Sequence, residues 1–372
     1  MVQYVEKGRK PRWGYFPKEG HPQVVTRFDG TKITPGFLQA IAYEVYVKNV
    51  TFGLLHQWLG DMGMTVSENT LRNWLKKGRK YLDRMVLELK RIALEKDAVV
   101  NCDETWCKVR KYDRYKKCYM WVLVNKAERV VIFFYEDGSR GRDVLTNFLG
   151  DAELKALMSD GYNAYVFIGD ELKTHRYKDT DHQGCLAHGR GKFVEARMEG
   201  GGKRADVFLD NINRLFRFER EYDREMITDG ERTRRRQGLP TMEAMINLRA
   251  NLLQELKSEE EQKSCYMREA LNYLHKFWNE AFTYIKDGRY PISNNLAERA
   301  VRPFTTKRKN SLHFGSDEGA EIAAVYHSII STVKLQGRSA WDYLGKFFTG
   351  IFNGCRDFLS LTPQNIDLAV CQ

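Results

Sequence analysis

The stretch VVNCDETW, residues 99–106, sets an apolar run of strand character directly before two adjacent carboxylates, Asp103 and Glu104. A second apolar run, ALMS at residues 156–159, leads to Asp160 in the same way. Gly161 follows and lets the backbone turn sharply away from the end of that strand. The two aspartates are therefore expected at the ends of two short β-strands.

A third carboxylate, Glu298, lies far along the chain in ISNNLAERAVRP, residues 292–303. Ser293 is a good helix N-cap, so Glu298 is expected in the first turns of a helix. Two strand-borne aspartates followed by a helix-borne glutamate is how an RNase H-like fold holds two Mg²⁺ ions about 4 Å apart for phosphoryl transfer. Glu298 comes 138 residues after Asp160, farther than this fold requires, so the sequence predicts an insertion between them.

Each carboxylate also has a purely structural interpretation. Asp103 and Glu104 face opposite sides of a strand, so one of them at most points into a shared site, and the residues by themselves do not choose. Asp160 with Gly161 is also an ordinary turn. Glu298 and Arg302 are one helical turn apart and can form an exposed ion pair worth roughly 0.2–0.5 kcal/mol. The choice therefore depends on the surrounding sequence.

Several longer motifs resemble the insertion-sequence-66 family of bacterial transposases. They are CDET (102–105), SDGYNAY (159–165), CLAHGRGKF (185–193), SNNLAERAVRP (293–303) and KRKNSLHFGSDEGAEIAAVYHSI (307–329). The similarity extends from about Gly36 to Phe348, with departures at Leu186, where the family usually has Trp, and at residues 189–191. The resemblance implies a DDE-type enzyme whose catalytic metal ligands are Asp103, Asp160 and Glu298. It also implies two Mg²⁺ ions, with Mn²⁺ able to substitute.

The chain has 372 residues and a net charge of +11. Residues 1–97 hold 17 Lys and Arg against 10 Asp and Glu, which suits a polyanionic partner, although a solvated basic surface explains the charge equally well. The seven cysteines are scattered and never spaced C-x-x-C, and the first residues lack the apolar segment of a signal peptide. We therefore expect a cytoplasmic protein without a membrane span, associated with the bacterial nucleoid when bound to DNA.

Hydrophobic periodicity divides the chain into segments of different expected structure. Runs of strand character at 99–106, 119–125 and 129–135 precede a helix at 141–149 and short strands at 157–160 and 183–186. This predicts an α/β protein with an RNase H-like mixed sheet in the order β-β-β-α-β-α-β. The expected parts are an extended basic arm (1–33), a helix-turn-helix module with a linker helix (34–97), the first part of the core (98–189), an all-helical insertion (190–290), the core with the catalytic glutamate helix (291–335) and a C-terminal helical segment (336–372).

Two groups of polar residues are candidates for DNA contacts. A third N-terminal helix, capped by Ser67, presents Arg72, Asn73, Lys76 and Lys77 on its polar face, as in a DNA-reading helix, or simply as a solvated surface. Beyond Glu298, the helix-breaking Pro303 is expected to let nearby basic side chains cluster beside the metals and hold phosphates. These side chains are Arg302, Lys307, Arg308 and Lys309.

Three further residues are expected to support the site. Asn294 and Asn295 can orient Glu298 or the DNA strand. Cys185 and His188 form a C-x-x-H pair, but no second pair at suitable spacing accompanies it, so a structural zinc site is not favoured. His188 is expected near the catalytic centre or a phosphate, with a structural histidine as the equal alternative.

The sequence thus predicts a DNA transposase that cuts transposon ends and joins them to target DNA by two-metal phosphoryl transfer. The alternatives are a metal-dependent nuclease of RNase H-like fold without strand transfer, and an inactive relative that binds DNA. The expected partners are transposon-end DNA and target DNA, with a homodimer or larger assembly on DNA. The resemblance adds small accessory proteins.

Overall fold

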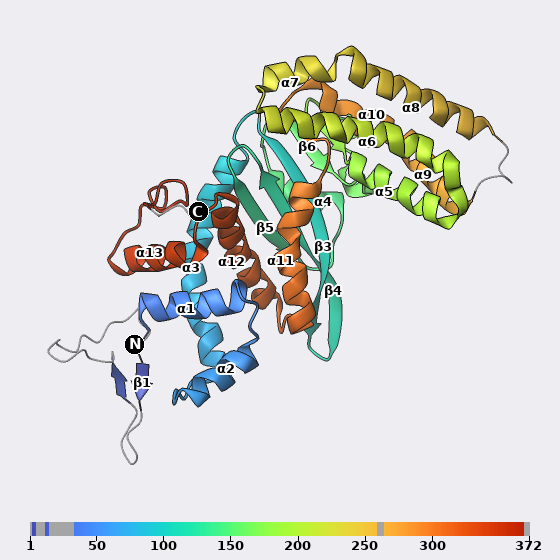
Figure 1. Ribbon diagram of the computed structural model, residues 1–372. Helices are drawn as coiled ribbons and strands as arrows, with labels where there is room; N and C mark the ends of the chain where they lie inside the picture. Colours follow the sequence, from blue (N-terminus) through green and yellow to red (C-terminus); the bar gives the residue numbers. More distant parts are fainter. Residues whose placement is uncertain (1, 5–11, 15–32, 259–263, 368–372) are drawn as a thin grey trace. The chain divides into compact units, whose positions relative to one another are not determined.

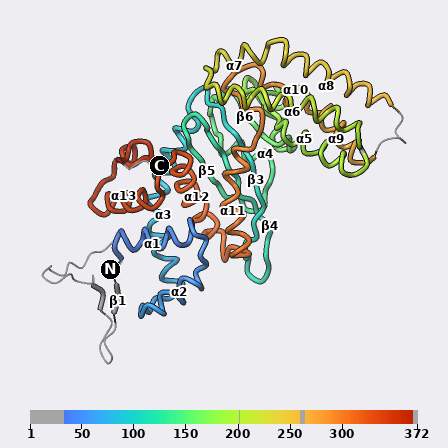
Figure 2. Tube along the Cα trace, in the orientation of Figure 1, coloured from blue at the N-terminus to red at the C-terminus, as the bar shows by residue number. Residues whose placement is uncertain are grey.

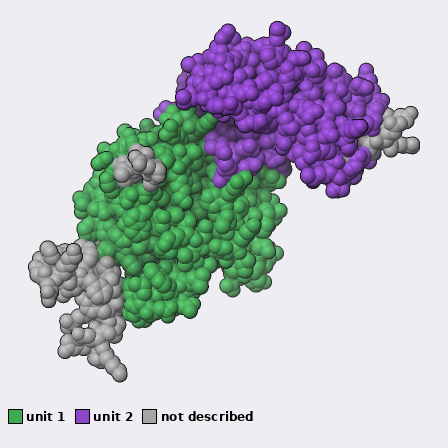
Figure 3. Space-filling view, viewed as in Figure 1, with its two compact units in different colours: residues 1–93, 104–140, 300–372 green, residues 94–103, 141–299 purple. Residues whose placement is uncertain are grey.

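The computed structural model describes residues 2–4, 12–14, 33–258 and 264–367. The chain divides into two compact units (Figure 3). Unit 1 comprises residues 1–93, 104–140 and 300–372, and unit 2 comprises residues 94–103 and 141–299. Of the expected arm at 1–33, strands β1 (Val2–Tyr4) and β2 (Arg12–Gly14) pair antiparallel, and nearly all the rest lies outside the described residues.

A five-stranded mixed sheet has the order β5-β4-β3-β6-β7 (Figure 1). Its strands are β3 (Val99–Lys111), β4 (Arg114–Asn125), β5 (Val130–Glu136), β6 (Ala156–Ser159) and β7 (Asp181–Gly184). Strands β4 and β5 pair antiparallel, whereas β3, β6 and β7 run parallel. All five expected strands are therefore present, and β3 and β4 each extend about five residues beyond expectation.

Unit 1 contains three N-terminal helices, α1 (Pro35–Tyr46), α2 (Phe52–Asp61) and α3 (Glu68–Ala93). The hydroxyls of Thr34, Thr51 and Ser67 accept backbone N–H groups at the three helix starts, which confirms the expected caps. The expected separate linker helix is wrong, because α3 continues without a break for 26 residues.

The N-terminal helices of unit 1 pack on its C-terminal ones, α12 (Asp317–Leu335) and α13 (Ala340–Phe352), as Figure 2 shows. Helix α1 contacts α13, and α3 contacts α12. Gly78 makes the second contact possible, since a Cβ there would lie 2.5 Å from the Tyr326 hydroxyl. On its other side α12 covers β5, where the hydroxyls of Ser328 and Thr332 bond to strand backbone.

Unit 2 surrounds the parallel strands with helices. These are α4 (Arg142–Leu149), α5 (Leu186–Ala196), α6 (Gly202–Glu225), α7 (Asp229–Arg236), α8 (Leu239–Lys257), α9 (Cys265–Lys276) and α10 (Trp278–Phe282). The described residues of the expected helical block are helices and short connections around one apolar core, in which Phe193 stacks on Phe208. The block begins at Leu186, four residues earlier than expected, because α5 follows β7 directly.

Two local expectations are wrong. No α-helix lies between β6 and β7, where the described chain has a 3₁₀ turn at Asn163–Tyr165 and loops. Helix α11 (Asn295–Ser311) runs through Pro303 without ending. A proline removes a single intrahelical donor, and hydroxyls of Thr305 and Thr306 bond to the nearby carbonyl of Arg302, so the helix continues.

Along the described parts of the chain, no helix combines the length and apolar character that crossing a membrane requires.

Candidate functional site

The parallel pairing of β3 with β6 determines where the two aspartates lie. Val99 pairs with Ala156, an offset of 57 residues, and the pairing continues through Asn101. Asp160 is 57 residues after Asp103, so the same register places the two side by side where the parallel strands end. Because neighbouring strands lie about 4.8 Å apart, both aspartates, each half-buried, occupy one edge of unit 2.

Asp160 is held by its own turn and by helix α9. Its Oδ1 accepts the Tyr162 N–H at 2.9 Å, and its carbonyl accepts the Tyr273 hydroxyl at 2.9 Å. Burial raises the pKa of the Tyr273 phenol, so this hydroxyl stays protonated and can donate at neutral pH. Gly161 has φ +86°, a conformation in which a side chain would be strained. The Asp-Gly turn is thus real, and it fixes the aspartate at the strand end.

Glu298 is positioned by Asn294, the residue directly before α11. The buried Asn294 side chain accepts a hydrogen bond from Asn101 Nδ2 at 3.0 Å and donates to the Cys102 carbonyl at 2.8 Å. Its carbonyl accepts the Glu298 N–H at 3.1 Å. These bonds tie the start of α11 to the end of β3. Glu298 is therefore carried on a helix end that is fixed to the strand bearing Asp103.

Cys185 and His188 lie next to Glu298. Cys185 precedes α5, and its N–H donates to the Ser159 carbonyl at the end of β6. One ligand atom from each of Cys185, His188 and Glu298 lies within 4.8 Å of the other two. Among the described residues, Asp103, Asp160 and Glu298 do not form such a trio. Burial raises the pKa of the Cys185 thiol to about 11, against nearby backbone N–H groups that favour the thiolate.

The choice between Asp103 and Glu104 is clear in the structure. Glu104 is buried, and its Oε1 accepts the Arg140 Nε at 2.7 Å in an ion pair within unit 1. A carboxylate neutralised in this way is committed to packing, whereas Asp103 lies on the opposite face of β3. This favours Asp103 as the strand-borne ligand.

The sequence did not point to Asn101 or Tyr273. Asn101 lies on the strand face that includes Asp103, and a buried polar residue two positions before a candidate ligand was the available signal. Tyr273 lies in the helical block, 113 residues after the aspartate whose carbonyl it contacts, and no local pattern could reveal that contact.

Comparison with known proteins settles the family. The family model described as "Transposase IS66 family" matches residues 30–322, which include all three carboxylates. The chain belongs to the IS66 family of transposases.

Relatives of this transposase-family chain occur in Sinorhizobium fredii. The uncharacterized protein y4jD is 27% identical over 255 residues, covering 65% of this chain and 47% of the relative. The uncharacterized protein y4qI is 28% identical over 239 residues, covering 63% and 43%. The match thus spans less than half the length of each relative.

The basic segment beyond Glu298 differs from expectation. Lys307 is buried, donates to the Val45 carbonyl at 3.0 Å and lies 3.7 Å from the centre of the Tyr46 ring. Burial lowers the pKa of its ammonium group to about 7. Arg308 stacks on Trp106 and donates to the Trp106 carbonyl at 2.6 Å. The expectation that Lys307 contacts DNA is therefore wrong, and Arg308 is already engaged in packing. Arg302 and Lys309 are exposed.

The expected DNA-facing residues of α3 are exposed in this IS66-family transposase. Arg72 pairs with Glu68 at 2.6 Å, and Lys76 pairs with Glu318 of α12, while Asn73 and Lys77 lie on the same exposed face.

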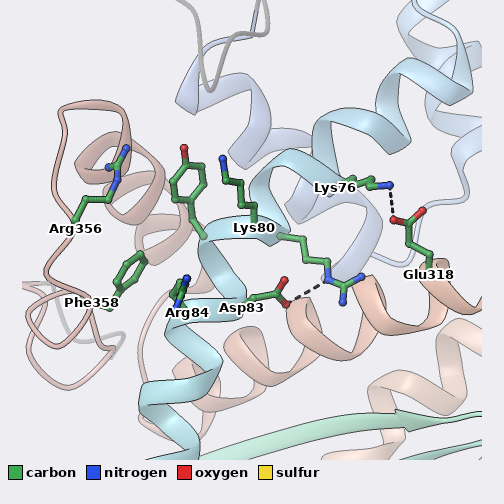
Figure 4. A pocket seen from close by; sticks show the side chains of 9 residues that line it. Lys76, Lys80, Asp83, Arg84, Glu318, Arg356 and Phe358 are labelled. Carbon is green, nitrogen blue, oxygen red and sulfur yellow. Dashed lines mark hydrogen bonds and ion pairs between the residues drawn. The ribbon is translucent and has the colours of Figure 1, made fainter.

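The next turns of α3 border a cleft of about 540 Å³ within unit 1 (Figure 4). The Tyr81 ring lies at its centre, with the Arg356 guanidinium 5.1 Å and the Lys80 ammonium 5.5 Å from the ring centroid. Five cationic and two acidic side chains line the cleft together with Tyr81 and Phe358. The charged ones are Lys76, Arg79, Lys80, Arg84, Arg356, Asp83 and Glu318. Sequence analysis missed the cleft because Arg356 and Phe358 come from the far end of the chain.

Proposed function

We propose that this chain is a DDE-type DNA transposase that cuts transposon ends and joins them to target DNA, on a sheet of RNase H-like fold. The observation that carries the proposal is the β3–β6 register, which brings Asp103 and Asp160 together where the two strands end. Glu298 follows on a helix end that Asn294 ties to the same strand. Membership of a transposase family supports the DNA substrate.

The donor set fits divalent magnesium. Three carboxylates of unit 2 offer hard oxygen ligands, and Glu298 borders a hollow of about 390 Å³. When bound, two such ions supply an activated oxygen nucleophile and neutralise charge on the leaving oxygen of a phosphodiester. Mn²⁺ offers the same coordination. The proposed ligands are Asp103, Asp160 and Glu298.

The remaining residues would position these ligands and the DNA strand. Asn294 fixes the start of α11, and Tyr273 fixes the backbone of Asp160, so neither carboxylate needs to be reordered when the site fills. His188 is half-exposed beside Glu298 and can donate a hydrogen bond to a phosphate oxygen. Arg302, exposed on α11, is the candidate for a scissile-strand phosphate contact.

We infer that α3 and the cleft beside it bind the DNA backbone. Cations around an accessible aromatic ring suit phosphates, sugars and unstacked bases. The exposed residues Arg72, Asn73, Lys76 and Lys77 would extend this contact along α3, in the manner of a helix-turn-helix module. Target DNA, an assembly of two or more copies on DNA, and accessory proteins are further proposals of the same reading.

The decisive experiment measures Mg²⁺-dependent cleavage and joining of end-containing DNA. Asp103→Asn, Asp160→Asn and Glu298→Gln should each abolish both reactions and leave DNA binding largely intact. Asp151→Asn, which changes a 91% exposed carboxylate of unit 2, is the matched control and should react normally.

The possible outcomes separate the competing functions. Cleavage without joining would favour a metal-dependent nuclease, and DNA binding without any cleavage would favour an inactive relative. Normal cleavage by any one of the three variants would remove that residue from the proposed site.

A further inference from the structure

We propose that Cys185, His188 and Glu298 form a binding site for a thiophilic divalent cation of the Zn²⁺ class, distinct from the carboxylate pair of Asp103 and Asp160. The three ligand atoms already lie within 4.8 Å of one another. A tetrahedral zinc site with metal–ligand bonds of about 2.0–2.3 Å needs its ligands roughly 3.3–3.8 Å apart. Small side-chain rotations therefore suffice to close the site.

The chemistry of the ligands selects a soft or borderline metal. A thiolate and an imidazole suit zinc, cobalt or copper, whereas magnesium takes oxygen ligands. The backbone N–H of Asn294 donates to the Cys185 sulfur at 3.1 Å. Such a donor stabilises the negative charge of a metal-bound thiolate. One carboxylate completes a three-ligand set with a fourth position open, the pattern of non-structural zinc sites.

A second trio in the protein provides a contrast. One ligand atom each from Cys118, Asp137 and Asp317 also lies within 4.8 Å of the others. There the Lys111 ammonium pairs with both aspartates, at 2.9 Å from Asp137, so the protein itself supplies the cation. Within the described chain, no lysine or arginine forms an ion pair with Glu298, whose partner is His188 Nδ1 at 3.7 Å.

The site is reached through the hollow of about 390 Å³ that His188 and Glu298 line. Lys192 also lines this hollow, but its ammonium pairs with Glu269 at 3.7 Å and lies 5.6 Å from the Tyr273 ring centre. The exposed carboxylate of Glu195 on the same wall partly offsets that charge. A cation can therefore approach Glu298 and His188 from solvent and reach the buried sulfur between them.

Cobalt titration of the full chain tests the site directly. Co²⁺ bound to a thiolate gives a charge-transfer absorption band, and Zn²⁺ should remove it by displacement. We expect one equivalent of Co²⁺ to produce the band in the wild type. Cys185→Ser should lose it, and His188→Ala and Glu298→Gln should bind cobalt more weakly. Cys265→Ser, which removes an exposed thiol of the same unit, is the control and should keep the band.

Three results would overturn the site. They are no band in the wild type, a band that survives Cys185→Ser, or unchanged affinity in both His188→Ala and Glu298→Gln. The last two variants alter half-exposed side chains, so they remain informative if the buried Cys185→Ser substitution prevents folding.

A second arm connects the site to the proposed function and rests on it. Zinc at this site withdraws Glu298 from the magnesium ligands, so Zn²⁺ should inhibit Mg²⁺-dependent cleavage. Cys185→Ser should bring the ratio of rates without and with zinc toward one. A protein that binds cobalt but cleaves nothing would refute the proposed function and leave the zinc site standing.

Discussion

Asn294 and Asn295 are neighbours in sequence with opposite surroundings. Asn294 is fully buried, and its amide exchanges hydrogen bonds with Asn101 and with the Cys102 carbonyl. Asn295 is exposed at the first position of α11. Sequence reasoning gave both the same supporting role, because hydrogen-bonding capacity is visible in a sequence and burial of a single loop residue is not.

This difference predicts unequal costs of substitution. Asn294→Ala leaves the Asn101 amide and the Cys102 carbonyl without a partner, and should lower the free energy of unfolding by about 2–3 kcal/mol. Asn295→Ala should change it by less than about 0.5 kcal/mol. Urea unfolding of both variants measures the difference, and equal effects would contradict the positioning role of Asn294.

Lys307 shows how strongly burial can change one residue's behaviour. Its pKa of about 7 lies well below the roughly 10.4 of an unfolded chain. Between these values the unfolded chain binds one more proton than the folded one, so this residue makes the unfolding free energy rise with pH from about 7 to about 10. The face of Tyr46, which favours the charged form, reduces the size of the effect.

Lys307→Met should remove that rise. The stability of the wild type relative to the variant should therefore increase between pH 7 and pH 9.5, by an amount on the order of 1–3 kcal/mol. Lys309→Met, two positions along the same helix and exposed, should show no such trend. Parallel stability curves for wild type and Lys307→Met would show that the amine is not held neutral.

At the scale of elements, periodicity and capping residues located the strands and the N-terminal helices well. The misses have identifiable causes. The break expected at Pro303 ignored side-chain bonds from Thr305 and Thr306. The helix expected between β6 and β7 was inferred from a fold pattern, whereas the chain there forms a 3₁₀ turn and loops. Local patterns predict an element's type more reliably than a topology predicts its existence.

Helix α7 shows how a basic run can be structural. Arg236 is 1% exposed, forms a two-bond ion pair with Glu219, and donates to the carbonyls of Tyr284, Asp287 and Tyr290. It thereby joins α6, α7 and the segment that leads to α11. The arginines before it are also paired with acidic residues, so this run is not a DNA-binding patch in the structure.

Arg236→Ala should therefore destabilise the protein by about 3–5 kcal/mol, because it leaves the buried Glu219 carboxylate uncompensated. Arg234→Ala removes the same charge from the same helix, at a side chain that is 78% exposed, and should cost less than about 1 kcal/mol. Thermal or urea unfolding compares the two. Similar losses in both variants would mean that Arg236 does not join these elements.

At the scale of the whole molecule, a net charge of +11 says that DNA is a plausible partner without saying which surface binds it. The described structure narrows the choice. The N-terminal helices share one compact unit with α12 and α13, so deletion of residues 34–97 would expose that core. Substitutions at single exposed residues are the sound test of DNA binding.

Two arginines of α3 allow that test. Arg84 borders the cleft with Tyr81 and Arg356, whereas Arg91, two turns further along the same helix, is 79% exposed and pairs with Glu88. Each change to alanine lowers the net charge by one. If binding depends on the overall field, Arg84→Ala and Arg91→Ala should weaken it equally. If the cleft holds a phosphate, Arg84→Ala should reduce the slope of log affinity against log salt by about one unit, and Arg91→Ala should leave the slope nearly unchanged. Filter binding or fluorescence anisotropy across a salt series, with end-containing and unrelated DNA, gives the slopes. Equal slopes for the two variants would assign DNA binding to the general charge of the molecule and remove the cleft from the proposed interface.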